Sequence, residues 1–248
     1  MPRTIEKVLC GEVNAVKKQG ILFLWLIPLL CWPFSHQAIL EADATAEIWE
    51  PRYLALTFDD GPKEGTTDLL LDGLKERSAA ATFFLLGDQA VLYPELVRRM
   101  QEEGHQVGNH TWSHKRLDGD VKEAVSEVER MEGLLREILG EEDHWLRPPY
   151  GVITEEAAAK ITVPIIKWSV DPRDWESRNA DVVVQRILDA VRPNSIILLH
   201  DIYPTSVEAA LRVVDVLQEE GYWFVTVEEL LRINGAAVYP GAVYRSGK

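Results

Sequence analysis

The regular alternation of short apolar runs with amphipathic segments, from residue 53 to residue 233, limits the possible folds more than any other feature of this sequence. Apolar runs bounded by Gly or Pro predict buried strands, whereas apolar residues at helical spacing, such as Leu70, Leu71 and Leu74, predict helices. Strands are expected at residues 53–58, 81–86, 105–109, 145–146, 163–170, 195–199 and 222–227. Helices are expected at residues 67–76, 94–103, 121–139, 155–161, 180–191, 207–219 and 228–233.

Strands that alternate with helices at this spacing form parallel βαβ units. Seven strands within residues 51–232 are too many for a small open sheet and somewhat compact for a complete eightfold barrel. We therefore expect an α/β fold, an irregular or incomplete (β/α) barrel of about seven parallel strands. The tail at residues 233–248 is rich in Gly, Pro and small residues, and we expect it to add little to the core.

Residues 1–46 differ in character from the rest of the chain. Lys17 and Lys18 precede the uncharged run Ile21–Trp32, which suits the core of a signal peptide and falls short of the roughly 20 residues that a spanning helix needs. A buried core helix is the alternative. We expect residues 1–46 to be a signal peptide or an N-terminal membrane anchor with a spacer, either cleaved or retained. The folded part would then lie outside the cytoplasm, free, in the cell wall or anchored to the membrane.

Charge and cysteine content exclude several classes of function. The formal net charge is −14, and no block of Lys or Arg interrupts it, which argues against nucleic acid as a partner and against docking on anionic lipid. The two cysteines, Cys10 and Cys31, both precede the folded part. A disulfide framework or a cysteine zinc site is therefore not expected there.

Reactive side chains follow the predicted strands, where the loops of a parallel barrel form its active face. They are Asp59 and Asp60 after the first strand, His110 and His114 after the third, Arg147 and Tyr150 after the fourth, Asp171, Asp174 and Trp175 after the fifth, and His200 and Asp201 after the sixth. One such placement is weak, since Asp59-Asp60-Gly61-Pro62 alone could be a solvated turn. Five in one chain predict a single site.

The spacing of His110 and His114 brings two imidazoles to one side of a helical turn. Together with one carboxylate of the Asp59–Asp60 pair they would form a set of ligands suited to zinc or another first-row divalent ion. Arg147 could pair with the aspartate that is not on the metal and keep it ionised.

His200 ends a buried apolar run and could be a core residue only. Alternatively, Asp171 at the adjacent strand end could hold its imidazole and tune it as an acid.

Five motifs resemble, in order, those of the polysaccharide deacetylase family (NodB-homology domain, carbohydrate esterase family 4). They are Thr57-Phe-Asp-Asp-Gly-Pro62, His110-Thr-x-x-His114, Arg147-Pro-Pro-Tyr150, Asp171-x-x-Asp174-Trp175 and Leu198-x-His200. The resemblance covers roughly residues 51–232, as a single catalytic domain. Pro172 departs from the family pattern, which more often has a small polar residue there.

The resemblance implies a metal-dependent N-deacetylase. Asp60, His110 and His114 would bind one divalent ion, with zinc first and cobalt, manganese or nickel as alternatives. Asp59 would be the general base for a water on the metal, and Arg147 would orient Asp59. That water would attack the acetamide carbonyl.

The remaining roles also follow from the resemblance. The metal and the backbone N–H of Tyr150 would stabilise the oxyanion. His200, supported by Asp171, would protonate the departing amine. Trp175 and Leu198 would form the wall of the acetyl pocket, although by periodicity alone both read as core residues.

The implied substrate is an N-acetylated polysaccharide or oligosaccharide, such as peptidoglycan, chitin-like oligomers or a related polymer. One alternative is an enzyme of the same fold that cleaves a non-sugar amide or imide. A non-catalytic carbohydrate-binding protein and an iron oxygenase with a two-histidine, one-carboxylate site are further alternatives. The sequence does not indicate the oligomeric state.

Overall fold

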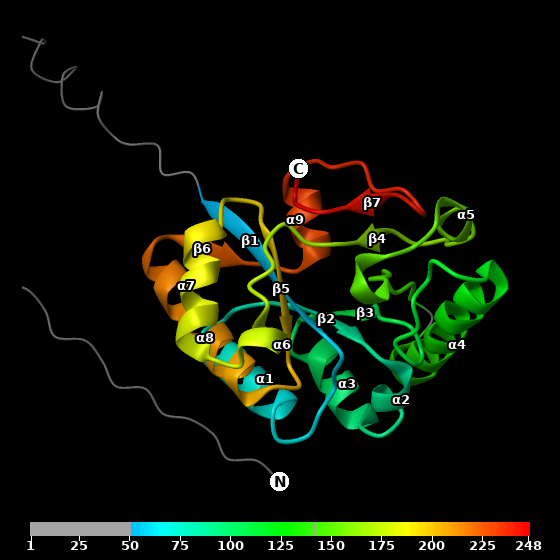
Figure 1. Cartoon of the computed structure of the whole chain (residues 1–248). Coiled ribbons are helices and arrows are strands. Elements are labelled where there is room, and N and C mark those ends of the chain that lie inside the picture. Colours follow the sequence, from blue (N-terminus) through cyan, green and yellow to red (C-terminus); the bar gives the residue numbers. More distant parts are fainter. Residues whose placement is uncertain (1–50, 141) are drawn as a thin grey trace, which may run out of the picture. The chain divides into compact units, whose positions relative to one another are not determined.

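The computed structural model describes residues 51–140 and 142–248 (Figure 1). The expected signal peptide or anchor at residues 1–46 lies outside these residues. Five parallel strands form the main sheet, in the order β3-β2-β1-β5, with β6 also paired to β1. Their bounds are β1 Arg52–Asp59, β2 Thr82–Leu85, β3 Gln106–Asn109, β5 Ile196–His200 and β6 Tyr222–Phe224.

Strand β1 is the centre of the sheet, and its apolar sequence follows from that position. It pairs with β2, β5 and β6, and Leu54, Leu56 and Phe58 are completely buried. The register sets Asp59 beside His200 of β5 and beside Phe84 of β2. The carboxyl ends of these strands therefore meet at one edge.

Helices cover this sheet and supply the rest of the core. They are α1 Thr67–Glu76, α2 Gly87–Ala90, α3 Pro94–Glu102, α4 Val121–Leu139, α5 Glu155–Ala158, α6 Asp174–Ser177, α7 Ala180–Ala190, α8 Pro204–Glu219 and α9 Val227–Ile233, with a 3₁₀ turn at Pro149–Gly151. None of the helices within residues 51–140 and 142–248 is long and apolar enough to cross a bilayer. The predicted helix-and-strand alternation is confirmed.

A second, two-stranded parallel sheet consists of β4 (Ile165–Ile166) and β7 (Val243–Tyr244). Single parallel bridges join it to the main sheet, through Leu146 to Asn109 on one side and from Val170 to Ile197 on the other. The structure thus has a parallel α/β architecture, in which the seven expected strands are divided between two sheets and single bridges. The predicted strand at 145–146 is reduced to one such bridge.

The predicted strand at 163–170 was too long. Only Ile165 and Ile166 pair as a strand, because the Arg147 side chain bonds the carbonyls of the last strand residue and of the residue after it. Nε donates to Ile166 O at 3.4 Å and Nη2 to Lys167 O at 3.1 Å. Those oxygens face the arginine instead of a neighbouring strand.

The C-terminal tail pairs with the rest of the fold through its backbone. Ile165 N–H donates to Ala242 O at 2.9 Å and Lys167 N–H to Tyr244 O at 2.7 Å, which makes β7 the partner of β4. Gly247 N–H also donates to Asn194 O at 2.9 Å. The tail therefore adds backbone pairing to the fold, because a two-residue strand needs backbone groups and no apolar run.

Candidate active site

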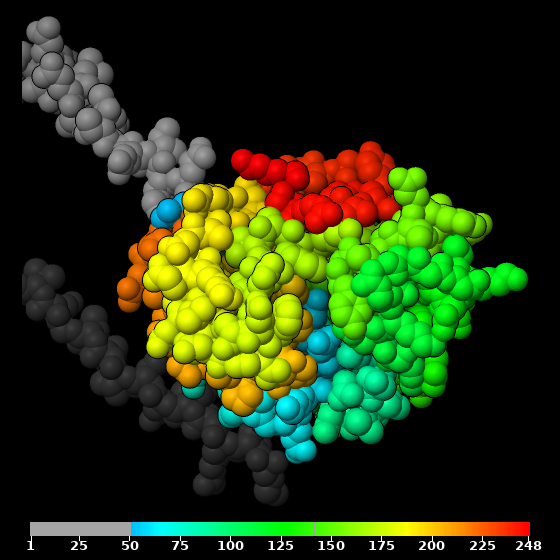
Figure 2. All heavy atoms as spheres, viewed as in Figure 1, coloured from blue at the N-terminus to red at the C-terminus, as the bar shows by residue number. Residues whose placement is uncertain are grey.

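A pocket of about 400 Å³ opens at the carboxyl ends of the strands. Figure 2 shows the hollow on this face, with blue atoms of the β1 region at its floor between green and yellow-green segments. Its lining comprises Asp59, Asp60, His110, His114, Tyr150, Trp168, Asp171, Trp175, Leu198, His200 and Tyr203. Nine of the ten residues that the sequence assigned a role in the site lie in this lining, and the tenth, Arg147, is buried outside it. Asp174 and Asp201, which also follow predicted strands, are buried and do not line the pocket.

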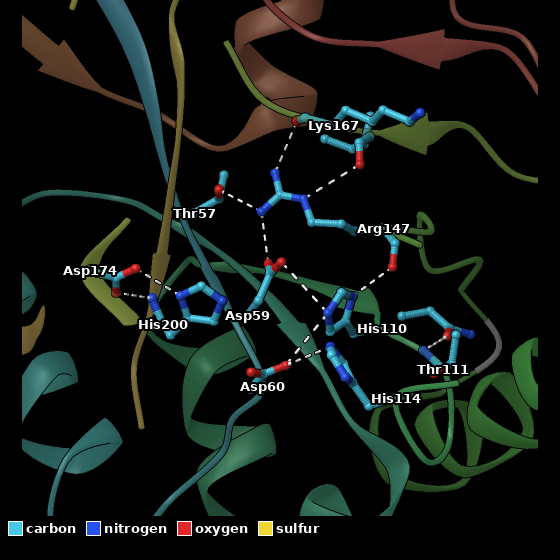
Figure 3. A network of polar contacts seen from close by, with 12 residues as sticks. Thr57, Asp59, Asp60, His110, Thr111, His114, Arg147, Lys167, Asp174 and His200 are labelled. Atoms are coloured by element: carbon cyan, nitrogen blue, oxygen red, sulfur yellow. Dashed lines mark hydrogen bonds and ion pairs between the residues drawn. The ribbon is translucent and has the colours of Figure 1, made fainter. Parts of the chain in front are cut away.

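Three candidate metal ligands converge in this pocket (Figure 3). Asp60 Oδ1 lies 3.5 Å from His110 Nε2 and 3.4 Å from His114 Nε2. These separations are close to the edge of about 3.3 Å that ligand atoms form around a tetrahedral ion at zinc–nitrogen distance. Asp60 Oδ1 is buried and has no hydrogen-bond partner among the described residues. An unpaired buried carboxylate oxygen is costly, so this donor set fits a cation.

The tautomer of His110 follows from its second nitrogen. His110 Nδ1 lies 2.6 Å from the backbone carbonyl oxygen of Arg147. Because a carbonyl can only accept, Nδ1 carries the proton and donates it. The lone pair is therefore on Nε2, the atom that faces Asp60, which is the arrangement of a metal-binding histidine.

The loop that carries both histidines is bent by left-handed residues and fixed by side chains. Thr111 and His114 have φ of 74° and 60°, and Thr111 N–H donates to Asn109 Oδ1 at 2.9 Å. Glu127 of α4 accepts a hydrogen bond from Ser113 N–H at 2.8 Å. Burial and the neighbouring His110 lower the pKa of His114. The imidazole of His114 is thus biased toward the neutral form that binds metals.

Asp59 lies beside this donor set and has a different partner. Arg147 Nη1 donates to Asp59 Oδ1 at 2.8 Å and to Thr57 Oγ1 at 2.7 Å. The guanidinium is completely buried and stacks 4.1 Å from the Phe84 ring centroid. The other carboxylate oxygen of Asp59 is 3.6 Å from His110 Nε2. One oxygen is therefore held by Arg147 while the second faces the candidate metal site.

His200 is held by Asp174, and the expected pairing with Asp171 was wrong. Asp174 Oδ1 is 2.9 Å from His200 Nδ1, and its Oδ2 accepts hydrogen bonds from His200 N–H at 2.8 Å and Ser206 Oγ at 2.6 Å. Asp171 is exposed, and its Oδ1 instead accepts from Arg173 N–H at 2.9 Å. The left-handed Arg173 (φ 51°) turns the chain, so that Asp174 at the start of α6 points inward.

The contact with Asp174 changes the acidity of His200. Burial opposes the charged imidazole, but the hydrogen bond and the charge of Asp174 outweigh it and raise the pKa of His200 to about 9. Burial alone would raise the pKa of Asp174, yet its hydrogen bonds from His200 and Ser206 lower it. At neutral pH this site holds an imidazolium with a proton to give.

The outer part of the pocket is aromatic. Tyr150, in a left-handed conformation with φ of 58°, has its ring 4.7 Å from that of His114, and its side chain is exposed. Trp175 is exposed and Leu198 is buried, and both line the pocket. Sequence reasoning missed two other lining residues. Trp168 was assigned to the interior of a strand, and Tyr203 had no signal beyond its place three residues after His200.

Comparisons with known proteins agree on one family. A sequence model described as polysaccharide deacetylase matches residues 48–163. The peptidoglycan-N-acetylmuramic acid deacetylase PdaC of Bacillus subtilis is 42% identical over 184 residues, which is 74% of this chain and 39% of that protein. This chain therefore spans about two fifths of the length of PdaC. A peptidoglycan-N-acetylglucosamine deacetylase of Bacillus cereus is 37% identical over 84% of both chains.

Solved structures give the same result. The PdaC structure from Bacillus subtilis superposes with a TM-score of 0.73 at 40% identity, covering 75% of this chain and 93% of that one. A family 4 acetyl xylan esterase from Clostridium thermocellum, solved in complex with a cobalt ion, gives a TM-score of 0.74 at 28% identity over 79% of this chain and 98% of that one.

Proposed function

Because the chain belongs to the polysaccharide deacetylase family, we propose that it is a metal-dependent hydrolase that removes N-acetyl groups from amino sugars of a polysaccharide. The substrate would be peptidoglycan, a chitin-like oligomer or a related polymer. One observation carries the proposal. A His₂Asp donor set, an arginine-held carboxylate and an aspartate-held imidazole line or adjoin one pocket.

Asp60, His110 and His114 would hold the ion. Zinc suits two imidazoles and a carboxylate best, and cobalt, manganese and nickel accept the same donors. When bound, the ion supplies a Lewis acid and lowers the pKa of a coordinated water.

Asp59 would act as the general base. Its Oδ1 is engaged by Arg147, so its other oxygen is the one available to accept a proton from the attacking water. Arg147 fixes the direction of the carboxylate and would not touch the substrate. Its burial, and its bonds to Thr57 and Lys167, prevent it from swinging into the pocket.

His200 would act as the general acid. Its Nδ1 is bonded to Asp174, which leaves Nε2 for the departing sugar amine, a poor leaving group without a proton. In Figure 3 the Asp174–His200 pair lies on the side of Asp59 opposite to His110 and His114. Base and acid would thus act from two sides of the acetamide.

The developing oxyanion and the acetyl methyl need partners too. We assign the oxyanion to the Tyr150 backbone N–H, a donor of a kind often worth about 3 kcal/mol in the transition state. Trp175 and Leu198 would enclose the methyl group. Asp171 lines the pocket and shapes the turn before α6, and we assign it no proton transfer.

We also propose export of this domain through residues 1–46, with the catalytic part outside the cytoplasm, because peptidoglycan lies there. The two peptidoglycan deacetylases described above support this location. Membrane tethering by the same segment would follow if it is retained.

Acetate release from peptidoglycan, chitin oligomers, acetylated glucosamine polymer and small non-sugar amides tests the function. Release from at least one glycan, abolished by a chelator and restored by a divalent ion, is expected. Asp59→Asn should retain the metal and lose turnover by roughly 10²–10⁴-fold. Full acetate release by Asp59→Asn would overturn the mechanism, and release from the small amides alone would overturn the substrate class.

A further inference from the structure

The charge of the pocket lining is mainly negative, with the His200 imidazolium as the one cation among the described lining residues. Asp59, Asp60 and Asp171 contribute three carboxylates, and within the described parts of the chain no lysine or arginine side chain lines the pocket. A bound divalent ion would offset part of this charge at Asp60. Arg147 and His200 are already bonded to Asp59 and Asp174, so a glycan that carries its own carboxylate would need a further cation near the pocket to bind it.

Arg178 is an exposed cation that contacts two residues of the pocket lining. It follows α6 in a left-handed conformation (φ 48°), and its Nε donates to the Trp175 carbonyl at 2.7 Å. Its guanidinium carbon lies 3.4 Å from the centroid of the Tyr203 ring. Trp175 and Tyr203 both line the pocket, so Arg178 is fixed against two of its walls.

The exposed Arg178 side chain has no carboxylate partner among the described residues. In contrast, Arg173, five residues earlier at the other end of α6, lies 3.6 Å from Glu176. One face of the Arg178 guanidinium stacks on Tyr203, and its Nε donates to the Trp175 carbonyl. The two terminal nitrogens therefore remain available to donate hydrogen bonds. That remaining edge is the one that binds a carboxylate with two parallel hydrogen bonds.

We propose that Arg178 binds a carboxylate of the substrate and gives the chain a preference for acidic over neutral N-acetylated glycans. The carboxylate would be that of a lactyl ether on the sugar or of a peptide attached to it. This proposal rests on the proposed deacetylation and names the substrate class of the same pocket.

Three substrates of matched length test the proposal: a neutral N-acetylglucosamine oligomer, a peptide-free glycan with lactyl groups, and the same glycan with peptides. The readout is the ratio of kcat/KM on an acidic glycan to that on the neutral oligomer. Arg178→Gln should lower this ratio roughly fivefold, the scale of a solvent-exposed ion pair. Arg178→Lys should keep part of it, and the wild-type ratio should fall as salt is added. The acidic glycan that shows the larger loss identifies the carboxylate.

Arg52 provides the matched control. Its guanidinium also stacks on a tyrosine, 4.5 Å from the Tyr222 ring, but at the beginning of β1, the end of the strand remote from the pocket. Arg52→Gln should leave the ratio unchanged. Equal losses on acidic and neutral glycans in Arg178→Gln would mean that Arg178 only supports Trp175 and Tyr203, and would overturn the proposal.

Binding separates this proposal from the proposed function. Calorimetric titration of the wild type and Arg178→Gln with the acidic glycans requires no turnover. If the wild type releases no acetate but still binds acidic glycans about fivefold more tightly than Arg178→Gln does, the inference holds and the deacetylase function fails. If acetate is released and the two proteins bind equally, the inference fails alone.

Discussion

Asp59 and Asp60 are neighbours in the chain, yet their carboxylates meet different partners. Asp59 is held by Arg147, whereas the buried Oδ1 of Asp60 faces two imidazole nitrogens. The difference arises because Asp60 adopts a left-handed conformation, with φ of 75°, directly after β1 ends. Two identical side chains can therefore serve different purposes one residue apart.

Their replacement should produce opposite defects. Asp60→Asn removes a charged ligand and should weaken zinc affinity by at least the roughly 10–100-fold that the loss of a supporting residue costs. Asp59→Asn should bind zinc nearly as the wild type does. Competition with a fluorescent zinc chelator measures both. Equal zinc affinities in the two variants would contradict the assignment of Asp60 as the ligand.

The acid limb of the mechanism is testable through pH. Since the pKa of His200 is raised to about 9, its proton is present below that pH and is lost as pH rises through it. If His200 is the acid, kcat should fall as pH rises toward about 9. A bound cation would repel the imidazolium and lower its pKa, so the fall should come at or below that pH.

Asp174→Asn should shift this limb further down. Without the carboxylate, burial dominates and lowers the pKa of His200, so activity should be lost at neutral pH and partly recovered in mild acid. Asp171→Asn is the matched control, because no hydrogen bond or ion pair joins Asp171 to His200. A pH profile that moves in Asp171→Asn and not in Asp174→Asn would contradict the pairing.

At the scale of the secondary-structure elements, helix α4 supports the loop that carries His110 and His114. Glu127 is a buried acid on this helix, and it accepts hydrogen bonds from both the N–H and the Oγ of Ser113, the residue before His114. Without these two hydrogen bonds, the loop that carries His110 and His114 would lose its attachment to Glu127. The helix would therefore support a bound metal ion without touching it.

Glu127→Ala should lower zinc affinity roughly 10–100-fold, the cost typical of a supporting contact, with little change in the pH profile of turnover. Glu129→Ala, on the exposed side of α4, should change neither. Zinc titration of both variants is the measurement. Wild-type affinity in Glu127→Ala would show that the loop holds His114 unaided.

The strands and helices could be predicted because their sequence periods are strong and local. β1, β2 and β5 are apolar runs buried on both faces, and α4 has a long amphipathic stripe. β7 carries neither signal, since its two residues pair through backbone groups alone. Strand 163–170 was overextended because its interruption comes from a distant side chain, that of Arg147.

Most residues of the site could be predicted from the sequence, but their contacts with one another could be predicted only in part. The contact of Arg147 with Asp59 follows from charge and from strand order. The choice between Asp171 and Asp174 for His200 does not, because both follow the same strand and the left-handed turn at Arg173 decides between them. Trp168 and Tyr203 are ordinary aromatic residues in sequence and become pocket walls only through folding.

At the scale of the whole molecule, the two sheets depend on the last residues of the chain. The carbonyls of Ala242, just before β7, and of Tyr244 accept hydrogen bonds from Ile165 and Lys167. Gly247 N–H donates to Asn194 O in the loop before β5. These contacts hold β4, which leads through Lys167 to Trp168, a residue of the pocket lining.

Truncation after Pro240 should therefore destabilise the protein by about 3 kcal/mol, at about 1 kcal/mol for each of these three hydrogen bonds. For a domain of this size that corresponds to a drop in Tm of roughly 6–12 °C, measurable by calorimetry. Removal of Lys248 alone is the control and should have a small effect. Unchanged Tm after the longer truncation would mean that β4 is stable without β7.

Arg147 serves the site twice, with its guanidinium on Asp59 and its carbonyl oxygen on His110. Every amino acid that could replace it keeps a carbonyl, so the acceptor that sets the tautomer of His110 belongs to the backbone and not to the side chain. The guanidinium does not survive a replacement. The two functions of this residue are thus unequally protected against mutation: a descendant that lost the arginine would forfeit its aligned base in one step and still hold a histidine ready for a metal. On the proposed function, such a protein would lose catalysis while keeping the residues that would bind the metal.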